Sequence, residues 1–169
     1  MNLYKLSSIP SNEKVLFDTN IFVYSALDHP KYGESCTEAF QRVESKEIKG
    51  YVPTIVLNEL LHRLMIAEVI KKELARNTRK VLDLLKHDKS VILSLNICWE
   101  ELDKIFASEF IVLEDMSNIF RDAITISREY SLLSSDAYIA SFAKRYGITN
   151  IATNDSDFEQ VEWTKVWKP

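Results

Sequence analysis

Hydrophobic and polar positions follow one another in blocks along the chain, and the blocks predict strands that alternate with helices. Short apolar runs typical of buried parallel strands occur at 14–17, 51–52, 110–113 and 148–152, and a last edge strand is predicted at 161–166. Apolar residues recur at helical spacing over 19–27, 33–48, 55–70, 72–87, 97–107, 116–130 and 134–146. The stretch 91–93 fits either a strand or a helix.

Single residues suggest where several of these helices begin and end. Thr54 is expected to cap the helix that starts at 55, and Ser134 or Ser135 to cap the last one. Gly50 is expected to end the helix over 33–48, and Gly147 the helix that runs to 146.

Helices placed between strands imply parallel pairing with right-handed crossovers. We therefore predict a three-layer α/β/α fold with a central parallel sheet. The length of 169 residues fits a single domain over 1–169, with 1–13 as a loose or edge-packed lead-in.

Composition narrows the setting more than the function. The net charge is −4, so any contact with nucleic acid needs a local basic patch or metal ions. Cys36 and Cys98 are far apart and lack the spacing of a zinc site, which favours two buried free thiols. No apolar run approaches the ~20 residues that span a bilayer, and the first residues lack a signal-peptide pattern, so we expect a cytoplasmic protein without a membrane partner.

Carboxylates follow two of the predicted strands. Asp18 comes directly after the strand over 14–17, and Asp155 and Asp157 follow the strand over 148–152. Ligands of open parallel sheets bind beyond the carboxyl ends of the strands, so both motifs fall on the binding edge. Each acid can equally be a plain helix cap, worth ~1 kcal/mol and without further function.

Two more acids interrupt apolar helix faces. Glu59 shares a helical line with Ile55 and Ile66, although it could pair with Arg63 one turn on. Asp136 stands at the head of a core-facing stripe, although the first turn of a helix favours an anion in any case. A bare carboxylate beside a core is costly unless it is paired, hydrogen-bonded or bound to a cation.

Taken together, the four acids suggest one cluster. Carboxylates crowded together repel, and a hard divalent cation held by oxygen ligands relieves the repulsion, which suits Mg²⁺ or Mn²⁺. Such ions acidify water and neutralise phosphoryl oxygens, so the cluster points to phosphodiester chemistry.

The motifs VLFDTN, NEL, SSDAYIASFAKRYG and IATNDSDF, in this order, resemble the PIN domain family, especially the VapC-type toxin ribonucleases, over 14–166. The resemblance implies a sheet order of 3-2-1-4-5, frequent homodimers, and cleavage of RNA that depends on a divalent metal. It also implies an antitoxin protein as a possible partner. The site residues that it implies are four catalytic, metal-binding acids (Asp18, Glu59, Asp136 and Asp155), a further metal ligand (Asp157) and two bracing residues (Asn20 and Thr153).

Two other functions compete with a ribonuclease. A catalytically silent module of the same fold would bind RNA or protein, but its usual mark, the loss of one of the four acids, is absent here. A phosphatase of the haloacid dehalogenase type also places an Asp after its first strand. It needs a second Asp two residues on as general acid, and this chain has Asn20 there.

Overall fold

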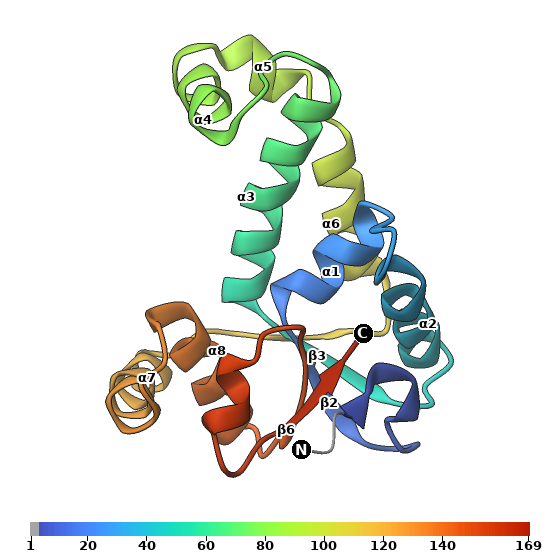
Figure 1. Ribbon diagram of the computed structural model, residues 1–169, viewed down its shortest axis with the longest axis vertical. Coiled ribbons are helices and arrows are strands. Elements are labelled where there is room, and N and C mark those ends of the chain that lie inside the picture. Colours follow the sequence, from blue (N-terminus) through green and yellow to red (C-terminus); the bar gives the residue numbers. More distant parts are fainter. Residues whose placement is uncertain (1–3) are drawn as a thin grey trace.

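The computed structural model describes residues 4–169 and is built on one parallel sheet, which crosses the lower half of Figure 1. The strand order is β1-β6-β5-β2-β3-β4, and every pair of neighbours is parallel. The strands are β1 (Tyr4–Lys5), β2 (Lys14–Phe17), β3 (Lys49–Pro53), β4 (Ile111–Leu113), β5 (Asn150–Ala152) and β6 (Lys165–Lys168). The predicted parallel sheet is confirmed, and its five expected strands keep the order implied by the family resemblance.

The sixth strand comes from the lead-in expected over 1–13, of which residues 1–3 lie outside the described part. Tyr4 pairs with Trp167 and Lys5 with Lys168, while Leu6 and Ile9 are buried. Strand β6 therefore lies inside the sheet, between β1 and β5, and the prediction that it is an edge strand is wrong. It also begins later than expected, because residues 161–164 form a turn that precedes it.

Helices flank the sheet, with α7 and α8 on the left of Figure 1 and α1 and α2 on the right. A long helix, α3, rises from the sheet beside α6 and carries α4 and α5 at its far end. The helices are α1 (Thr19–Ala26), α2 (Gly33–Glu44), α3 (Thr54–Lys71), α4 (Thr78–His87), α5 (Lys89–Leu93), α6 (Ile97–Ala107), α7 (Ser117–Tyr130) and α8 (Ser134–Arg145), with short 3-10 turns at η1 (Leu6–Ser8) and η2 (Asp157–Gln160).

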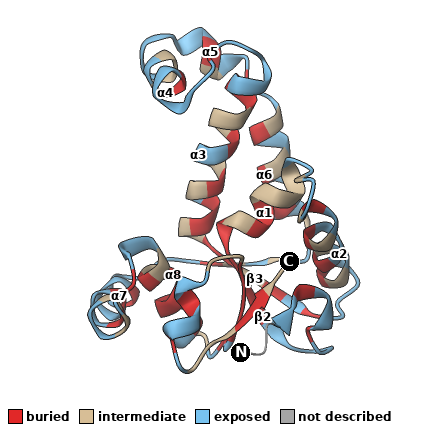
Figure 2. Cartoon of the chain, viewed as in Figure 1, coloured by how far each residue is buried: buried red, intermediate tan, exposed pale blue. Residues whose placement is uncertain are grey.

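The core lies on the two faces of the sheet. The three residues of β5 and the last three of β2 are buried, and Figure 2 shows buried positions on the strands and on the helix faces turned toward them. The outlying α4 is mostly exposed, with Val81 as its buried residue. No helix among residues 4–169 is both long enough and apolar enough to cross a membrane.

Some helix limits differ from the expected ones. Helix α2 ends at Glu44, because Lys46 takes up a left-handed conformation with φ of 61° and turns the chain toward β3. The helix predicted over 72–87 starts only at Thr78, where the side chain of Asn77 accepts a hydrogen bond from the N–H of Lys80. The ambiguous stretch 91–93 is helical and lies in α5.

The two hydroxyl caps expected from the sequence are wrong. Helix α3 begins one residue earlier than a cap at Thr54 requires, and α8 begins one or two residues earlier than a cap at Ser134 or Ser135 requires, so Pro53 and Leu133 occupy the N-cap positions. Thr54 and Ser134 then lie inside the first turn, and neither helix has a side-chain cap. Gly147 follows α8 with φ of 62°, as a helix-ending glycine does.

Gly50 does not end a helix but makes room inside the core. It lies in β3, and a Cβ there would approach the Phe110 ring to 2.6 Å and Cγ2 of Val43 to 2.8 Å. The ring cannot easily retreat, because it packs edge-on against Phe17 with centroids 5.1 Å apart.

We expect Gly50→Ala to lower the free energy of unfolding by about 1–3 kcal/mol, the usual range for overpacking. Urea unfolding measures this loss. Combining it with Phe110→Leu, which vacates the space, should cost less than the sum of the two single changes. Strictly additive losses would mean that the two positions do not compete for space.

Candidate metal centre

Asp18 lies at the carboxyl end of β2 and is the N-cap of α1. Its carboxylate is 7% exposed and accepts a hydrogen bond of 2.6 Å from the N–H of Thr19. The capping explanation is thus correct for Asp18. It accounts for one carboxylate oxygen, whereas the other is turned toward the neighbouring strand β5.

Thr153 and Asn20 hold that second oxygen. The Thr153 hydroxyl donates to it at 2.6 Å, and the Asn20 amide donates to it as well. The Asn20 amide also donates to the Thr153 hydroxyl at 2.9 Å, which ties the end of β5 to the start of α1. Both residues therefore hold the Asp18 carboxylate by hydrogen bonds.

Three further carboxylates meet where the chain leaves β5. Carboxylate oxygens of Asp136, Asp155 and Asp157 all lie within 4.8 Å of one another, close enough to share one ion. Asp136 comes from the first turn of α8, while the other two belong to the loop after β5 and the start of η2. The N–H of Asp157 donates to Oδ1 of Asp155 at 2.8 Å, and this short turn fixes the two acids side by side.

Glu59 approaches the same place from α3. Its Oε2 accepts a hydrogen bond of 3.2 Å from the Thr19 hydroxyl, next in sequence to Asp18. Its Oε1 pairs with Arg63, whose Nε and Nη2 lie at 2.9 Å and 2.7 Å. Of the five predicted acids, Glu59 is the one that has a basic side chain as an ion-pair partner among residues 4–169.

The charges of these acids act on one another. Burial, followed by repulsion from Asp155, Asp18, Asp157 and Glu59, raises the pKa of Asp136 from 3.8 to about 6. Burial also raises the pKa of Asp18 to about 6, against the hydrogen bonds from Thr153 and Thr19. Glu59 and Asp155 add to the rise. The five carboxylates, which we call the acid site, therefore form one electrostatic cluster.

The acid site suits a hard divalent cation. Its donors are carboxylate oxygens, the ligand type that Mg²⁺ and Mn²⁺ prefer. Four of its five acids lack an ion-pair partner among the described residues, so the crowded negative charge calls for a cation from solution. A doubly charged ion would lower the raised pKa values by favouring the ionised carboxylates.

Sequence reasoning missed two side chains beside the acid site. Thr19 is buried and links Asp18 to Glu59 through its N–H and hydroxyl groups. The N–H of Asn154 donates to the Asn20 side chain at 3.0 Å, and its amide donates to the Tyr24 hydroxyl at 3.1 Å. Both lie inside the motifs FDTN and TNDSD, so position within a motif was the available signal.

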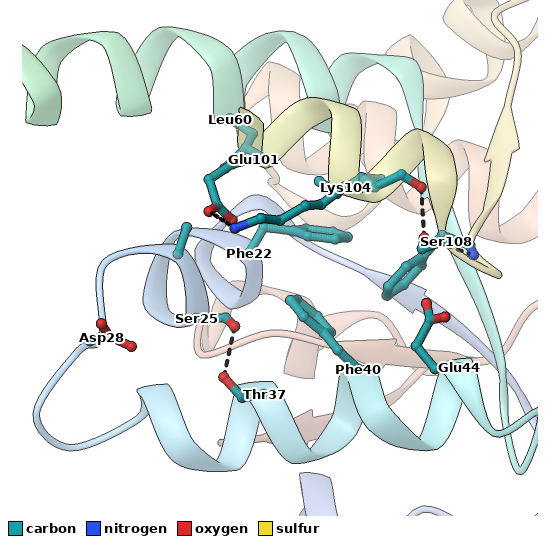
Figure 3. Close-up of a pocket in the computed structure, with 13 residues that line it drawn as sticks. Phe22, Ser25, Asp28, Thr37, Phe40, Glu44, Leu60, Glu101, Lys104 and Ser108 are labelled. Atoms are coloured by element: carbon teal, nitrogen blue, oxygen red, sulfur yellow. Dashed lines mark hydrogen bonds and ion pairs between the residues drawn. The ribbon is translucent and has the colours of Figure 1, made fainter. Parts of the chain in front are cut away.

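A separate cavity of about 430 Å³ lies between α1, α2 and α6 (Figure 3). Phe22 and Phe40 line its apolar part, while Lys104 forms an ion pair of 2.6 Å with Glu101 at its edge. No member of the acid site lines this cavity. The candidate chemistry therefore belongs to the sheet edge and not to this hollow.

Comparisons with known proteins match the chain along most of its length. A family model described as PIN domain matches residues 15–164. The chain is 31% identical over 155 residues to Ribonuclease VapC2 of Methanocaldococcus jannaschii. The aligned region covers 90% of this chain and 92% of that relative.

Solved structures show the same fold at low sequence identity. One is VapBC2 from Rickettsia felis, bound to a DNA fragment from its promoter. It matches with a TM-score of 0.60 and 18% identity over 92% of this chain and 98% of that one. VapC20 of Mycobacterium tuberculosis, described as a Sarcin-Ricin loop cleaving toxin, matches with a TM-score of 0.57 and 12% identity over 88% of this chain and 95% of that one.

Proposed function

We propose, from the premise that the chain belongs to the PIN domain family, that it is an endoribonuclease that depends on Mg²⁺ or Mn²⁺. The observation that carries the proposal is the acid site, where carboxylates from distant parts of the chain come together and their repulsion adds to the burial that raises the pKa of Asp18 and of Asp136. Carboxylates without cations are costly to gather at a sheet edge, and a role in phosphodiester hydrolysis explains why they are gathered.

Each residue then has a defined task. Asp18, Asp136, Asp155 and Asp157 hold the ion, directly or through water, and Glu59 holds it or orients the attacking water. When bound, the ion supplies an acidified water and neutralises charge on the phosphate. Thr153 and Asn20 keep Asp18 in one orientation, and Thr19 does the same for Glu59. Attack of water on phosphorus breaks the bond to the 3′ oxygen and leaves a 5′-phosphate and a 3′-hydroxyl.

The proposal extends to partners. Structural neighbours include VapBC2 of Rickettsia felis and a toxin–antitoxin complex from Klebsiella pneumoniae, which supports an antitoxin protein as partner of this chain. We place the toxin in the cytoplasm, where its RNA substrate would be, and as a homodimer, in line with the family resemblance.

A catalytically silent module of the same family is the second candidate. The observation that favours it is the Arg63–Glu59 ion pair, which occupies one oxygen of a proposed metal ligand. The phosphatase alternative receives no such support, since Asn20 donates a hydrogen bond to Asp18 and has no acidic proton to give a leaving group.

Metal titration separates the two candidates. We expect Mn²⁺ to bind the metal-free protein in calorimetry and to stabilise it by about 2–3 kcal/mol at a hundredfold excess over Kd. Cleavage of labelled RNA should require Mn²⁺ and stop when EDTA is added. A protein that binds no Mn²⁺ and leaves RNA intact would be the silent module.

A further inference from the structure

A cluster of hydrogen-bond donors with the opposite electrostatic character adjoins the acid site. It contains Lys31 and Tyr32 from the segment between α1 and α2, Tyr24 from α1, and Asn154 from the loop after β5. Asn154 directly precedes Asp155, so the cluster begins one residue from the acid site. We call these four residues the donor cluster.

The phenol hydroxyls and the ammonium group of the donor cluster have hydrogens that remain available to a ligand. The Lys31 ammonium donates to the Tyr32 hydroxyl at 2.9 Å, and the Asn154 amide donates to the Tyr24 hydroxyl at 3.1 Å. Each phenol oxygen thus acts as an acceptor, and neither phenol donates a hydrogen bond to another of the described residues. The Lys31 ammonium has two further N–H donors, and no carboxylate of residues 4–169 forms an ion pair with it.

Packing holds these donors in place. The His29 ring stacks on Tyr32 with centroids 5.0 Å apart and an interplanar angle of 18°, and Tyr24 lies 5.0 Å from Tyr32. Nδ1 of His29 accepts the N–H groups of Lys31 and Tyr32 at 3.2 Å and 3.3 Å, which fixes the turn that carries them. Lys31 and Tyr32 are therefore preorganised on a turn that is fixed by its own hydrogen bonds, unlike solitary lysines on a surface.

The local electrostatics fit an anion. The hydrogen bond from Lys31, and to a smaller extent Asn154 and the positive charge of Lys168, lower the pKa of the Tyr32 hydroxyl. Lys168 is itself neutralised by an ion pair of 2.5 Å with Glu159, so Lys31 supplies the uncompensated charge. The Tyr32 ring stacks on His29 and has the Lys31 ammonium 4.7 Å from its centroid, and the Tyr24 ring is tilted against both rings, which disfavours base stacking as the use of this cluster.

We infer that the donor cluster is a subsite for a backbone phosphate of single-stranded RNA, next to the phosphate that is cleaved. The inference rests on the proposed function, because it gives the same substrate a second anchoring point. The arrangement also resolves an electrostatic problem, since the acid site repels RNA and needs nearby donors to hold the strand. The Lys31 ammonium and the two phenol hydroxyls would donate to the phosphate oxygens.

Binding of fluorescein-labelled single-stranded RNA to the full chain in EDTA tests the subsite without cleavage. Lys31→Gln should weaken binding about 3–10-fold and reduce the slope of log K against log salt by about 0.7, the share of one phosphate contact. Tyr32→Phe keeps the ring that packs on His29 and should weaken binding about 2–5-fold. The matched control is Lys86→Gln on α4, an exposed lysine at the far end of the molecule, which should leave affinity and slope unchanged.

Each outcome decides the matter. A loss in Lys31→Gln and Tyr32→Phe but not in Lys86→Gln supports the subsite, and an equal loss with single-stranded DNA shows that phosphate is read rather than the 2′-hydroxyl. Equal affinities for Lys31→Gln and Lys86→Gln, or a wild-type protein that binds no RNA, overturn the inference. Because the readout is metal-free binding, a failure of RNA cleavage would remove the proposed function and leave this result standing.

Discussion

Asp136→Asn should abolish metal-dependent RNA cleavage, with a loss on the order of a hundredfold or more, and yet make the metal-free protein more stable. The loss follows because asparagine is a neutral, weaker ligand at the point where three carboxylates meet. The gain follows because the substitution removes one of several charges that repel one another.

The increase in stability expected for Asp136→Asn follows from how the protonation of Asp136 depends on pH. The pKa of Asp136 is about 6 in the folded chain and near 3.8 when unfolded, so folding favours its protonated form. The stabilisation that protonated Asp136 gives to the folded wild-type protein is fully present below pH 3.8 and is lost as the pH rises through about 6. Asparagine lacks this loss, and at pH 7.5 the variant should gain about 1–2 kcal/mol, after a discount for the partial exposure of Asp136.

Urea unfolding at pH 5 and pH 7.5 in EDTA measures the stability, and a labelled RNA with Mn²⁺ measures the cleavage. Glu34→Gln is the matched control, since Glu34 also lies in the first turn of a helix but stands outside the acid site. Its replacement should lose about 0.3–1 kcal/mol of helix-dipole stabilisation and leave cleavage intact. If Asp136→Asn behaved like this control, Asp136 would be a helix-terminus acid and nothing more.

The sequence located the acid site better than it described its surroundings. Asp18, Asp155 and Asp157 could be placed together because parallel strands bring their carboxyl ends to one edge, a rule that needs no coordinates. The extra strand at Tyr4 could not be foreseen, because it is fixed by pairing with β6 at the other end of the chain. Local propensity carries no record of such contacts.

Helix ends were the weakest part of the prediction for a related reason. A shift of one residue in the start of α3 or α8 turns a capping hydroxyl into a first-turn residue, and the apolar periodicity does not resolve such a shift. The donor cluster escaped notice because Lys31 and Tyr32 are separated from Asn154 by most of the chain. Their proximity appears only when α1 and β5 are placed side by side.

Glu68 is a further residue whose contacts with a distant segment are not visible in the sequence. Glu68 follows Leu64 by one turn on the buried side of α3 and has Lys72 one turn on, and the structure leaves it only 2% exposed. Its carboxylate accepts the N–H of Asn96 at 2.8 Å and the N–H of Cys98 at 3.0 Å, and pairs with Lys72 at 2.8 Å. Helix α6 lacks a side-chain cap from its own N-cap residue, so Glu68 of α3 caps it instead.

Replacing Glu68 by glutamine should therefore cost about 2–4 kcal/mol in the free energy of unfolding at pH 7, the largest stability loss that we predict. Burial alone would raise the pKa of Glu68, but hydrogen bonds from Lys72 and from the N–H groups at the start of α6 outweigh it and lower the pKa to about 2. Since the unfolded value is near 4.5, this stabilisation is present above pH 4.5 and is lost as the pH falls through about 2. Urea unfolding should accordingly show the gap between wild type and Glu68→Gln narrowing from pH 7 to pH 3, while Glu73→Gln, at an exposed neighbour, shows little change at either pH. Mn²⁺ affinity should be the same in all three proteins, because Glu68 lies outside the acid site. If the difference in unfolding free energy between wild type and Glu68→Gln stayed constant with pH, the ionised carboxylate would not be what holds α6 to α3.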